Sequence, residues 1–168
     1  MLKNNSIKLR LLKDSNEDYH LLYKWYQNEN VYKYFEQRTL DYSEVVNKYK
    51  NRTKINSNIP VYMILYNNNP IGIIQYNKKH NYNYEYDYEL DIFIGEYDYY
   101  NKGIGKIALN LLINKLGNHK YMLVVEEDNI RAIKCYLGVG FIIIDHIKEE
   151  NTIGIIKEKL VMIYDKRK

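Results

Sequence analysis

Apolar positions in the first third of the chain predict one strand followed by two amphipathic helices. Residues 6–12 are typical of an opening strand. The next apolar residues recur at helical spacing over about four turns, after Asp14 or Ser15, either of which can act as the N-cap. A second helix follows a short break, with Asp41 as its cap. The two apolar stripes consist of Leu21, Leu22, Trp25 and Tyr26, and then of Tyr42, Val45, Val46 and Tyr49.

Three β-type segments follow. Residues 61–66 and 71–76 are apolar runs joined by three Asn and a Pro at 67–70, which favour a hairpin. Both runs have the composition of strands that are buried on two faces. A third strand is predicted around residues 84–95, followed by a loop at 96–102.

The second half of the chain alternates helices and strands. Its clearest amphipathic helix runs from Ile104 to a glycine C-cap near Gly117. The remaining predicted elements are a strand at 120–125, a short helix at 129–137 and strands at 140–146 and 153–164. The order β-α-α-β-β-β-α-β-α-β-β predicts an α/β fold of the α+β type. We expect a mixed, mostly antiparallel sheet of six to seven strands with helices on both faces and one right-handed βαβ crossover.

Composition suggests one domain made in a reducing compartment. The 168 residues are 46% apolar and 27% charged, and no linker or repeat divides them, so a single domain over 1–168 is expected. The lone Cys135 cannot form an internal disulfide. No run of about 18 apolar residues and no signal-peptide pattern occurs, so we expect a soluble, cytoplasmic protein. Twenty tyrosines against three phenylalanines indicate a compositional bias, so no tyrosine is assigned a role on its identity alone.

Acidic residues concentrate in one segment of a chain whose formal net charge is +4. Residues 81–100 contain six carboxylates and no Lys or Arg. Four of them, Glu85, Asp87, Glu89 and Asp91, alternate with apolar residues and would share one face of a strand. That face either is solvated or binds a cation. Asp91 directly precedes an apolar run and should lie deepest, where a carboxylate among carboxylates can act as a base near neutral pH.

A glycine-rich segment, residues 100–106, follows the third strand and opens a helix. Free N–H groups and the positive end of the helix dipole make such a segment a site for pyrophosphate, and Lys102 and Lys106 add positive charge. Gly103-x-Gly105-x-x-Ala108, with Glu126 about twenty residues on, also matches a dinucleotide fingerprint. A helix entry that binds no ligand is the third possibility.

Asn129 and Tyr136 form a further pair on the short helix at 129–137. Asn129 is a natural N-cap, and Tyr136, seven residues on, lies on the same helical face. The hydroxyl of Tyr136 can donate a proton or satisfy a hydrogen bond in the core. Cys135 is expected to be a small buried side chain, not a nucleophile. The four histidines lack ligand spacing, so no metal site is predicted.

Together these segments resemble the GNAT superfamily of acetyl-CoA-dependent N-acetyltransferases. The resemblance rests on the loop at 100–106, the Asn129 and Tyr136 pair and the following Gly140-Phe141, with Tyr100 where the superfamily has Gln or Arg. The sequence is most similar to the aminoglycoside 6'-N-acetyltransferases. Three stretches carry that similarity: Lys24-Trp25-Tyr26 with Glu29-Asn30-Val31, Tyr66-Asn67-Asn68 with Pro70-Ile71-Gly72, and Asp91 to Glu96 continuing into Lys102 to Gly105.

The resemblance implies roles for individual residues. Asp91 would be the catalytic base, Tyr136 the general acid, and Asn129 a contact near the cofactor thiol. Backbone groups of Phe93 and Ile94 would bind the pantetheine arm. The pyrophosphate loop would consist of Tyr100, Asn101, Lys102, Gly103, Ile104, Gly105 and Lys106. The expected acceptor contacts are Trp25, Glu85, Asp87, Glu89 and Asp91.

The expected reaction is transfer of the acetyl group of acetyl-CoA to a primary amine, the 6'-amine of an aminoglycoside. An amine with a pKa near 10 is protonated at pH 7 and needs a base before it attacks a thioester. The acidic strand would attract a polycation. The alternatives are acetylation of a polyamine, streptothricin or a protein N-terminus, or a non-catalytic CoA-binding module. No nucleic acid or membrane partner is expected. The sequence does not decide whether the protein is a monomer or a homodimer, or whether its activity contributes to antibiotic resistance.

Overall fold

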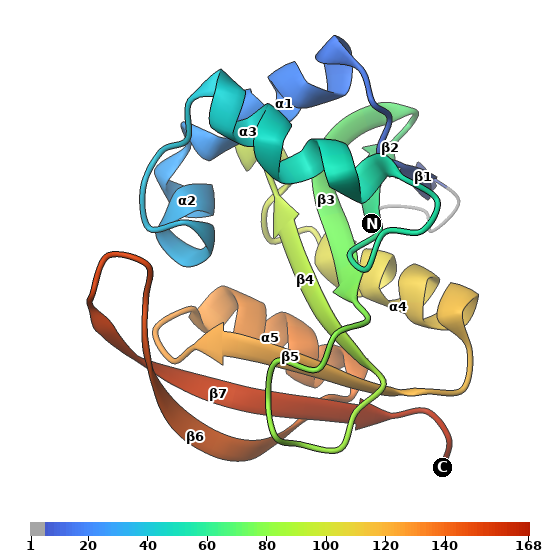
Figure 1. The fold of residues 1–168 in the computed structure, drawn as a ribbon. Helices are drawn as coiled ribbons and strands as arrows, with labels where there is room; N and C mark the ends of the chain where they lie inside the picture. The colour runs from blue at the N-terminus through green and yellow to red at the C-terminus, as the bar shows by residue number, and fades with distance from the viewer. Residues whose placement is uncertain (1–5) are drawn as a thin grey trace.

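Seven strands and five helices make up residues 6–168, the part of the chain that the computed structural model describes (Figure 1). The strands are β1 (Ile7–Leu11), β2 (Val61–Tyr66), β3 (Asn69–Asn77), β4 (Tyr88–Ile94), β5 (Lys120–Glu126), β6 (Ile142–Glu150) and β7 (Ile156–Asp165). The helices are α1 (Asn16–Tyr26), α2 (Glu29–Phe35), α3 (Tyr42–Lys50), α4 (Ile104–Leu116) and α5 (Ile130–Val139). Two 3₁₀ turns, η2 (Asn51–Thr53) and η3 (Tyr97–Tyr99), connect them.

One mixed sheet contains all seven strands in the order β1-β2-β3-β4-β5-β7-β6. Every neighbouring pair is antiparallel except β4 and β5, which confirms the predicted mixed, mostly antiparallel sheet. The parallel pair is short, because only Tyr88 with Tyr121 and Glu89 with Met122 are in register. Beyond these positions β4 and β5 diverge, as Figure 1 shows. The edge of β4 that faces β5 therefore has no strand partner after Glu89.

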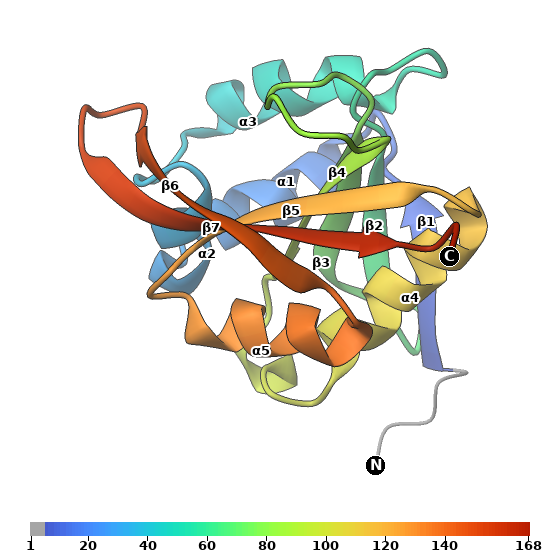
Figure 2. The same ribbon diagram turned by 90° about the horizontal axis from the view of Figure 1, so that it is seen from below.

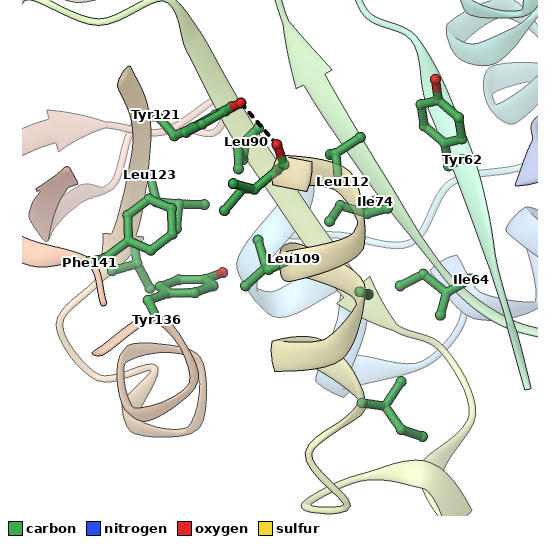
Figure 3. Packing of buried hydrophobic residues seen from close by; sticks show 14 of the residues in the cluster. Tyr62, Ile64, Ile74, Leu90, Leu109, Leu112, Tyr121, Leu123, Tyr136 and Phe141 are labelled. Carbon is green, nitrogen blue, oxygen red and sulfur yellow. Dashed lines mark hydrogen bonds between the residues drawn. The ribbon is translucent and has the colours of Figure 1, made fainter. Parts of the chain in front are cut away.

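Helices cover both faces of the sheet, as predicted. In Figure 2, α1 and α3 lie on one face and α4 and α5 on the other. β2 and β3 are buried on both faces, because alternate residues enter the two cores: Met63 packs below α1 and α3, and Ile64 packs below α4. Figure 3 shows the α4 side, where the Tyr121 hydroxyl donates to the carbonyl of Ile113 at 3.3 Å. Among the described residues, no helix is long and apolar enough to cross a membrane.

The first predicted helix is α1, and an additional helix, α2, lies in the predicted break before Asp41. α1 ends at Tyr26, and the Asn28 side chain then accepts a hydrogen bond from the N–H of Asn30 and caps α2. A polar N-cap such as Asn28 is the local signal by which this short helix could have been predicted. Ser15, not Asp14, caps α1, and the capping box of Asp41 with Glu44 confirms the predicted start of α3.

Several strand boundaries differ from prediction: β3 and β6 extend to Asn77 and Glu150, β7 begins only at Ile156, and the starts of β4 and β6 are also shifted. β4 begins at Tyr88 instead of residue 84, so Glu85 and Asp87 lie in the preceding loop and only Glu89 and Asp91 share a strand face. The prediction that four carboxylates share one face is therefore wrong. β6 begins at Ile142, because Gly140 adopts φ of 117° and ends α5 as a left-handed C-cap.

Candidate active site

Three neighbouring cavities are lined in part by β4, the strand that diverges from β5. Tyr34 and Phe35, at the end of α2, line all three. The loop cavity, about 370 Å³, is bounded by residues 99–106 and by α5. The hairpin cavity, about 300 Å³, is bounded by residues 149–152 between β6 and β7. The α3 cavity, about 310 Å³, is bounded by Lys48 and Arg52.

The loop cavity is built around the start of α4. Residues 100–106 all line it. Asn101 and Gly103 take positive φ angles of 58° and 75°, and no side chain caps α4. The N–H groups of its first turn are therefore available to an anion at the positive end of a helix of 13 residues.

Four cations and no carboxylate line the loop cavity: Lys102, Lys106, Arg131 and Lys134. The guanidinium of Arg131 lies 4.0 Å from the ring centroid of Tyr100, which places a charge and a stacked ring together. Arg131 and Lys134 were not among the residues predicted for this loop. Their position on the same short helix as Asn129 and Tyr136 was the signal that could have revealed them.

The dinucleotide interpretation of this loop is wrong. That fingerprint belongs to a doubly wound parallel sheet, whereas here β4 and β5 are the single parallel pair among the described strands. Gly105 instead permits close packing of α4 on α5, because a Cβ there would lie 3.1 Å from Sγ of Cys135. Burial raises the pKa of the Cys135 thiol to about 11, so it is a poor nucleophile at neutral pH.

Phe93 and Ile94 line the loop cavity along the edge of β4 that β5 leaves unpaired. The Phe93 side chain is buried against Trp25, with ring centroids 6.0 Å apart, and against Phe35, with centroids 4.9 Å apart. Its backbone is therefore the part that can contact a ligand.

Asn129 and Tyr136 lie where the loop cavity meets the hairpin cavity, since both residues line both spaces. Asn129 caps α5 by accepting a hydrogen bond from the N–H of Ala132. Tyr136 is 6% exposed and packs near Phe141 (Figure 3). Its hydroxyl forms no hydrogen bond within residues 6–168, so a structural hydrogen bond does not account for it. Burial raises the pKa of Tyr136 well above its usual range, so the hydroxyl keeps its proton at neutral pH.

Asp91 lines the hairpin cavity and the α3 cavity. Its register partner on β3 is Gln75, whose Nε2 donates to Oδ2 of Asp91 at 3.2 Å. Arg52 in η2 donates in turn to Oε1 of Gln75 at 2.9 Å. The hairpin cavity thus joins Asp91 and Tyr136, the two residues that the sequence analysis assigns to proton transfer.

Glu89 lies two residues before Asp91 on the same face of β4 and lines the α3 cavity. Burial, and then the negative charge of Asp91, raise the pKa of Glu89 to about 7. Asn81 opposes this shift by donating a hydrogen bond at 3.2 Å. Glu89 therefore changes charge close to neutral pH.

Carboxylates outnumber cations in the hairpin cavity. It is lined by one ammonium group, that of Lys159, and by four carboxylates: Asp91, Glu126, Glu149 and Glu150. Glu126 is 6% exposed, accepts a hydrogen bond from Gln37 at 2.9 Å and lies 3.3 Å from the Lys157 ammonium. Glu149 and Glu150 were not predicted to lie in the site, and Glu126 was predicted only as part of the dinucleotide fingerprint.

The α3 cavity has mixed charge. Lys48 pairs with Glu36, and Lys159 pairs with Glu149. Burial, and then the charge of Arg52, lower the pKa of Lys48 to about 8. Cations on this wall therefore face the carboxylates of β4.

Three predicted acceptor contacts, Trp25, Glu85 and Asp87, do not line any of the three cavities. Trp25 is fully buried, and its Nε1 donates to Glu96 at 2.9 Å. Glu85, in the loop before β4, pairs with Lys120 and Arg167. Asp87 accepts the backbone N–H of Lys120 at 2.8 Å and so joins that loop to β5. Within residues 6–168, no cluster of His, Cys, Asp and Glu that could hold a metal ion occurs.

Comparison with known proteins gives one family and several solved structures. The family model described as the acetyltransferase (GNAT) family matches residues 19–141. Aminoglycoside acetyltransferase AAC(6')-Ib with coenzyme A and kanamycin has a TM-score of 0.76 and 21% identity over 95% of both chains. Spermidine N-acetyltransferase from Vibrio cholerae with CoA and spermine has a TM-score of 0.78 and 21% identity over 96% of both chains. The microcin C7 self-immunity acetyltransferase MccE with acetyl-CoA and AMP has a TM-score of 0.80 and 17% identity, covering 96% of this chain and 93% of that chain. At these identities the structural likeness shows the fold.

Proposed function

Because the chain belongs to the acetyltransferase (GNAT) family, we propose that it acetylates a primary amine of a small polycationic acceptor, with the 6'-amine of an aminoglycoside as the preferred substrate. The acetyl donor is acetyl-CoA. One observation carries the choice of acceptor: the loop cavity is lined by four cations and no carboxylate, whereas the hairpin cavity is lined by four carboxylates and one cation. A polyanionic donor and a polycationic acceptor fit these two spaces.

The residues of the loop cavity suit the donor. Its pyrophosphate would bind the first N–H groups of α4, with Arg131 and Lys134 adding charge. The unpaired edge of β4 at Phe93 and Ile94 offers backbone groups to the pantetheine amides. A donor bound in this way would point its thioester toward Asn129 and Tyr136.

The residues at the junction of the cavities suit direct attack. Asp91 takes a proton from the ammonium group of the acceptor, either directly or through water. The freed amine forms the C–N bond, the C–S bond breaks, and Tyr136 donates a proton to the departing thiolate. The nitrogen loses its remaining extra proton as it becomes an amide nitrogen, and this proton restores the Tyr136 hydroxyl through water. The products are an N-acetyl amine and free CoA. Holding both reactants in one cleft supplies much of the acceleration.

The test is release of free CoA thiol from acetyl-CoA in the presence of an amine panel. We expect turnover with kanamycin-type aminoglycosides and little turnover with spermidine or peptide N-termini. Turnover with spermidine alone would contradict the aminoglycoside assignment. Binding of acetyl-CoA without thiol release for any amine would indicate a non-catalytic CoA-binding module.

A further inference from the structure

Two hydrogen bonds in series connect η2 to Asp91 through β3. Arg52 donates to Oε1 of Gln75 at 2.9 Å, and Nε2 of Gln75 donates to Oδ2 of Asp91 at 3.2 Å. Gln75 is 8% exposed, and it is the register partner of Asp91 in the antiparallel β3–β4 pair. The two side chains therefore project from adjacent strands on the same face of the sheet.

The direction of this series is fixed by Arg52. A guanidinium has only donors, so it binds the oxygen end of the Gln75 amide and leaves the NH₂ end for Asp91. Without that bond the amide could turn over and present its oxygen to a carboxylate, which would repel it. Arg52 is itself held 5.1 Å from the ring centroid of Tyr49. In the part of the chain that the structure describes, it forms no ion pair with a carboxylate.

We propose that Gln75 and Arg52 are positioning residues for the reaction, an inference that depends on Asp91 being the base of the proposed function. Gln75 holds Oδ2, so that Oδ1, which accepts no hydrogen bond within residues 6–168, is the oxygen that takes the proton of the acceptor. Arg52 keeps the Gln75 amide in the orientation that makes this possible. The competing role for Arg52 is direct contact with an anionic group of the acceptor, since it also lines the α3 cavity.

Substitutions of Gln75 test the donor directly. Gln75→Glu keeps the shape and the partner of Arg52 but replaces the N–H donor by an oxygen, and Gln75→Met removes both polar ends. A hydrogen bond to a charged group contributes enough for kcat to fall about 10- to 100-fold in both variants. The KM for acetyl-CoA should not change. Unchanged kcat in both variants would overturn the proposal.

Substitutions of Arg52 separate positioning from acceptor binding. We expect Arg52→Met to lower kcat as Gln75→Met does, and Arg52→Lys, which keeps a donor and the charge, to restore part of the loss. Arg38 is the matched control, because it pairs with Glu44 outside all three cavities, and Arg38→Met should leave kcat unchanged. A loss confined to the KM of the acceptor would show direct binding by Arg52 and overturn the proposal.

A double-mutant cycle keeps this inference distinct from the proposed function. In an Asp91→Asn background, Gln75→Met should cause no further loss of kcat, because the group it positions is gone. An equal loss in both backgrounds would mean that Gln75 acts elsewhere and would overturn the positioning role. If Asp91→Asn alone left kcat unchanged, the proposed function would fail at its base. Thermal unfolding of each variant identifies losses that come from misfolding.

Discussion

Tyr136 is the residue whose chemistry depends most on its surroundings. In a chain with twenty tyrosines its identity alone indicates nothing. Its place at the junction of the loop and hairpin cavities, and a pKa raised by burial, leave it protonated beside the expected thiolate. If the Tyr136 hydroxyl donates a proton, its removal should lower kcat; if Tyr136 only packs in the core, removal of the hydroxyl should leave kcat unchanged.

We expect Tyr136→Phe to lower kcat about 100-fold, within the range for loss of a general acid, while the KM for acetyl-CoA changes little. Steady-state rates of thiol release measure this effect. Tyr97→Phe is the control, because Tyr97 is 72% exposed and lies outside the three cavities. Equal rates for Tyr136→Phe and the unmodified protein would show that the hydroxyl has no part in proton transfer.

Glu89 should make stability depend on pH. Its folded pKa of about 7 lies above the ordinary 4.5, so the folded state binds the proton more tightly and the protein loses stability as pH rises through this window. We expect Glu89→Gln to raise the free energy of unfolding by about 1–3 kcal/mol at pH 8 relative to the native residue. At pH 3.5 the gain should shrink toward zero, since Glu89 is then largely protonated in both states. Urea unfolding at the two pH values measures this, and an equal effect at both would contradict it.

At the scale of elements, the packing of α4 on α5 sets the shape of the loop cavity. A Cβ at position 105 would meet Sγ of Cys135 at 3.1 Å, so Gly105→Ala should move the start of α4 and raise the Kd for acetyl-CoA about tenfold. Cys135→Ala should restore part of the affinity in the double variant. Calorimetric titration with acetyl-CoA measures both effects, and unaltered affinity in Gly105→Ala would contradict the expected close packing.

Elements with local signals were predictable. Alternation, helical spacing and turn residues placed all seven strands, and the glycine-rich segment at 100–106 indicated the start of α4. The helix α2 was missed because it has only seven residues and begins within a run of four polar ones, and the start of β4 was misplaced because Tyr84 and Tyr86 continue the alternation. Tyr86 is in fact buried in a loop, where its hydroxyl accepts the N–H of Asn81.

The acceptor side of the site was far less predictable than the donor side. The donor loop is contiguous in sequence. The residues of the acceptor side come from separate elements that only the fold brings together: Arg52 from η2, Gln75 from β3, Glu126 from β5 and Glu149 from β6. No spacing rule connects them. The register of β3 with β4 is the fact that brings Gln75 to Asp91.

At the scale of the whole molecule, opposite charge on adjoining cavities is the main electrostatic feature. Carboxylates of the hairpin cavity should attract a polycation over a distance of about 10 Å at moderate salt. We expect kcat/KM for a polycationic amine to fall about tenfold between low and high ionic strength, and to fall less for a monoamine. Glu150→Gln should weaken this salt dependence, whereas Glu85→Gln, outside the cavities, should not. An identical salt dependence for both amines would contradict electrostatic attraction of the acceptor.

The most direct test of the central claim, that Asp91 is the base in a cleft between donor and acceptor, is the turnover of Asp91→Asn measured at saturating acetyl-CoA and kanamycin. We expect acetyl-CoA affinity and thermal stability to stay close to those of the native protein, and kcat to fall by about 100-fold or more. A kcat equal to that of the native protein would contradict the claim.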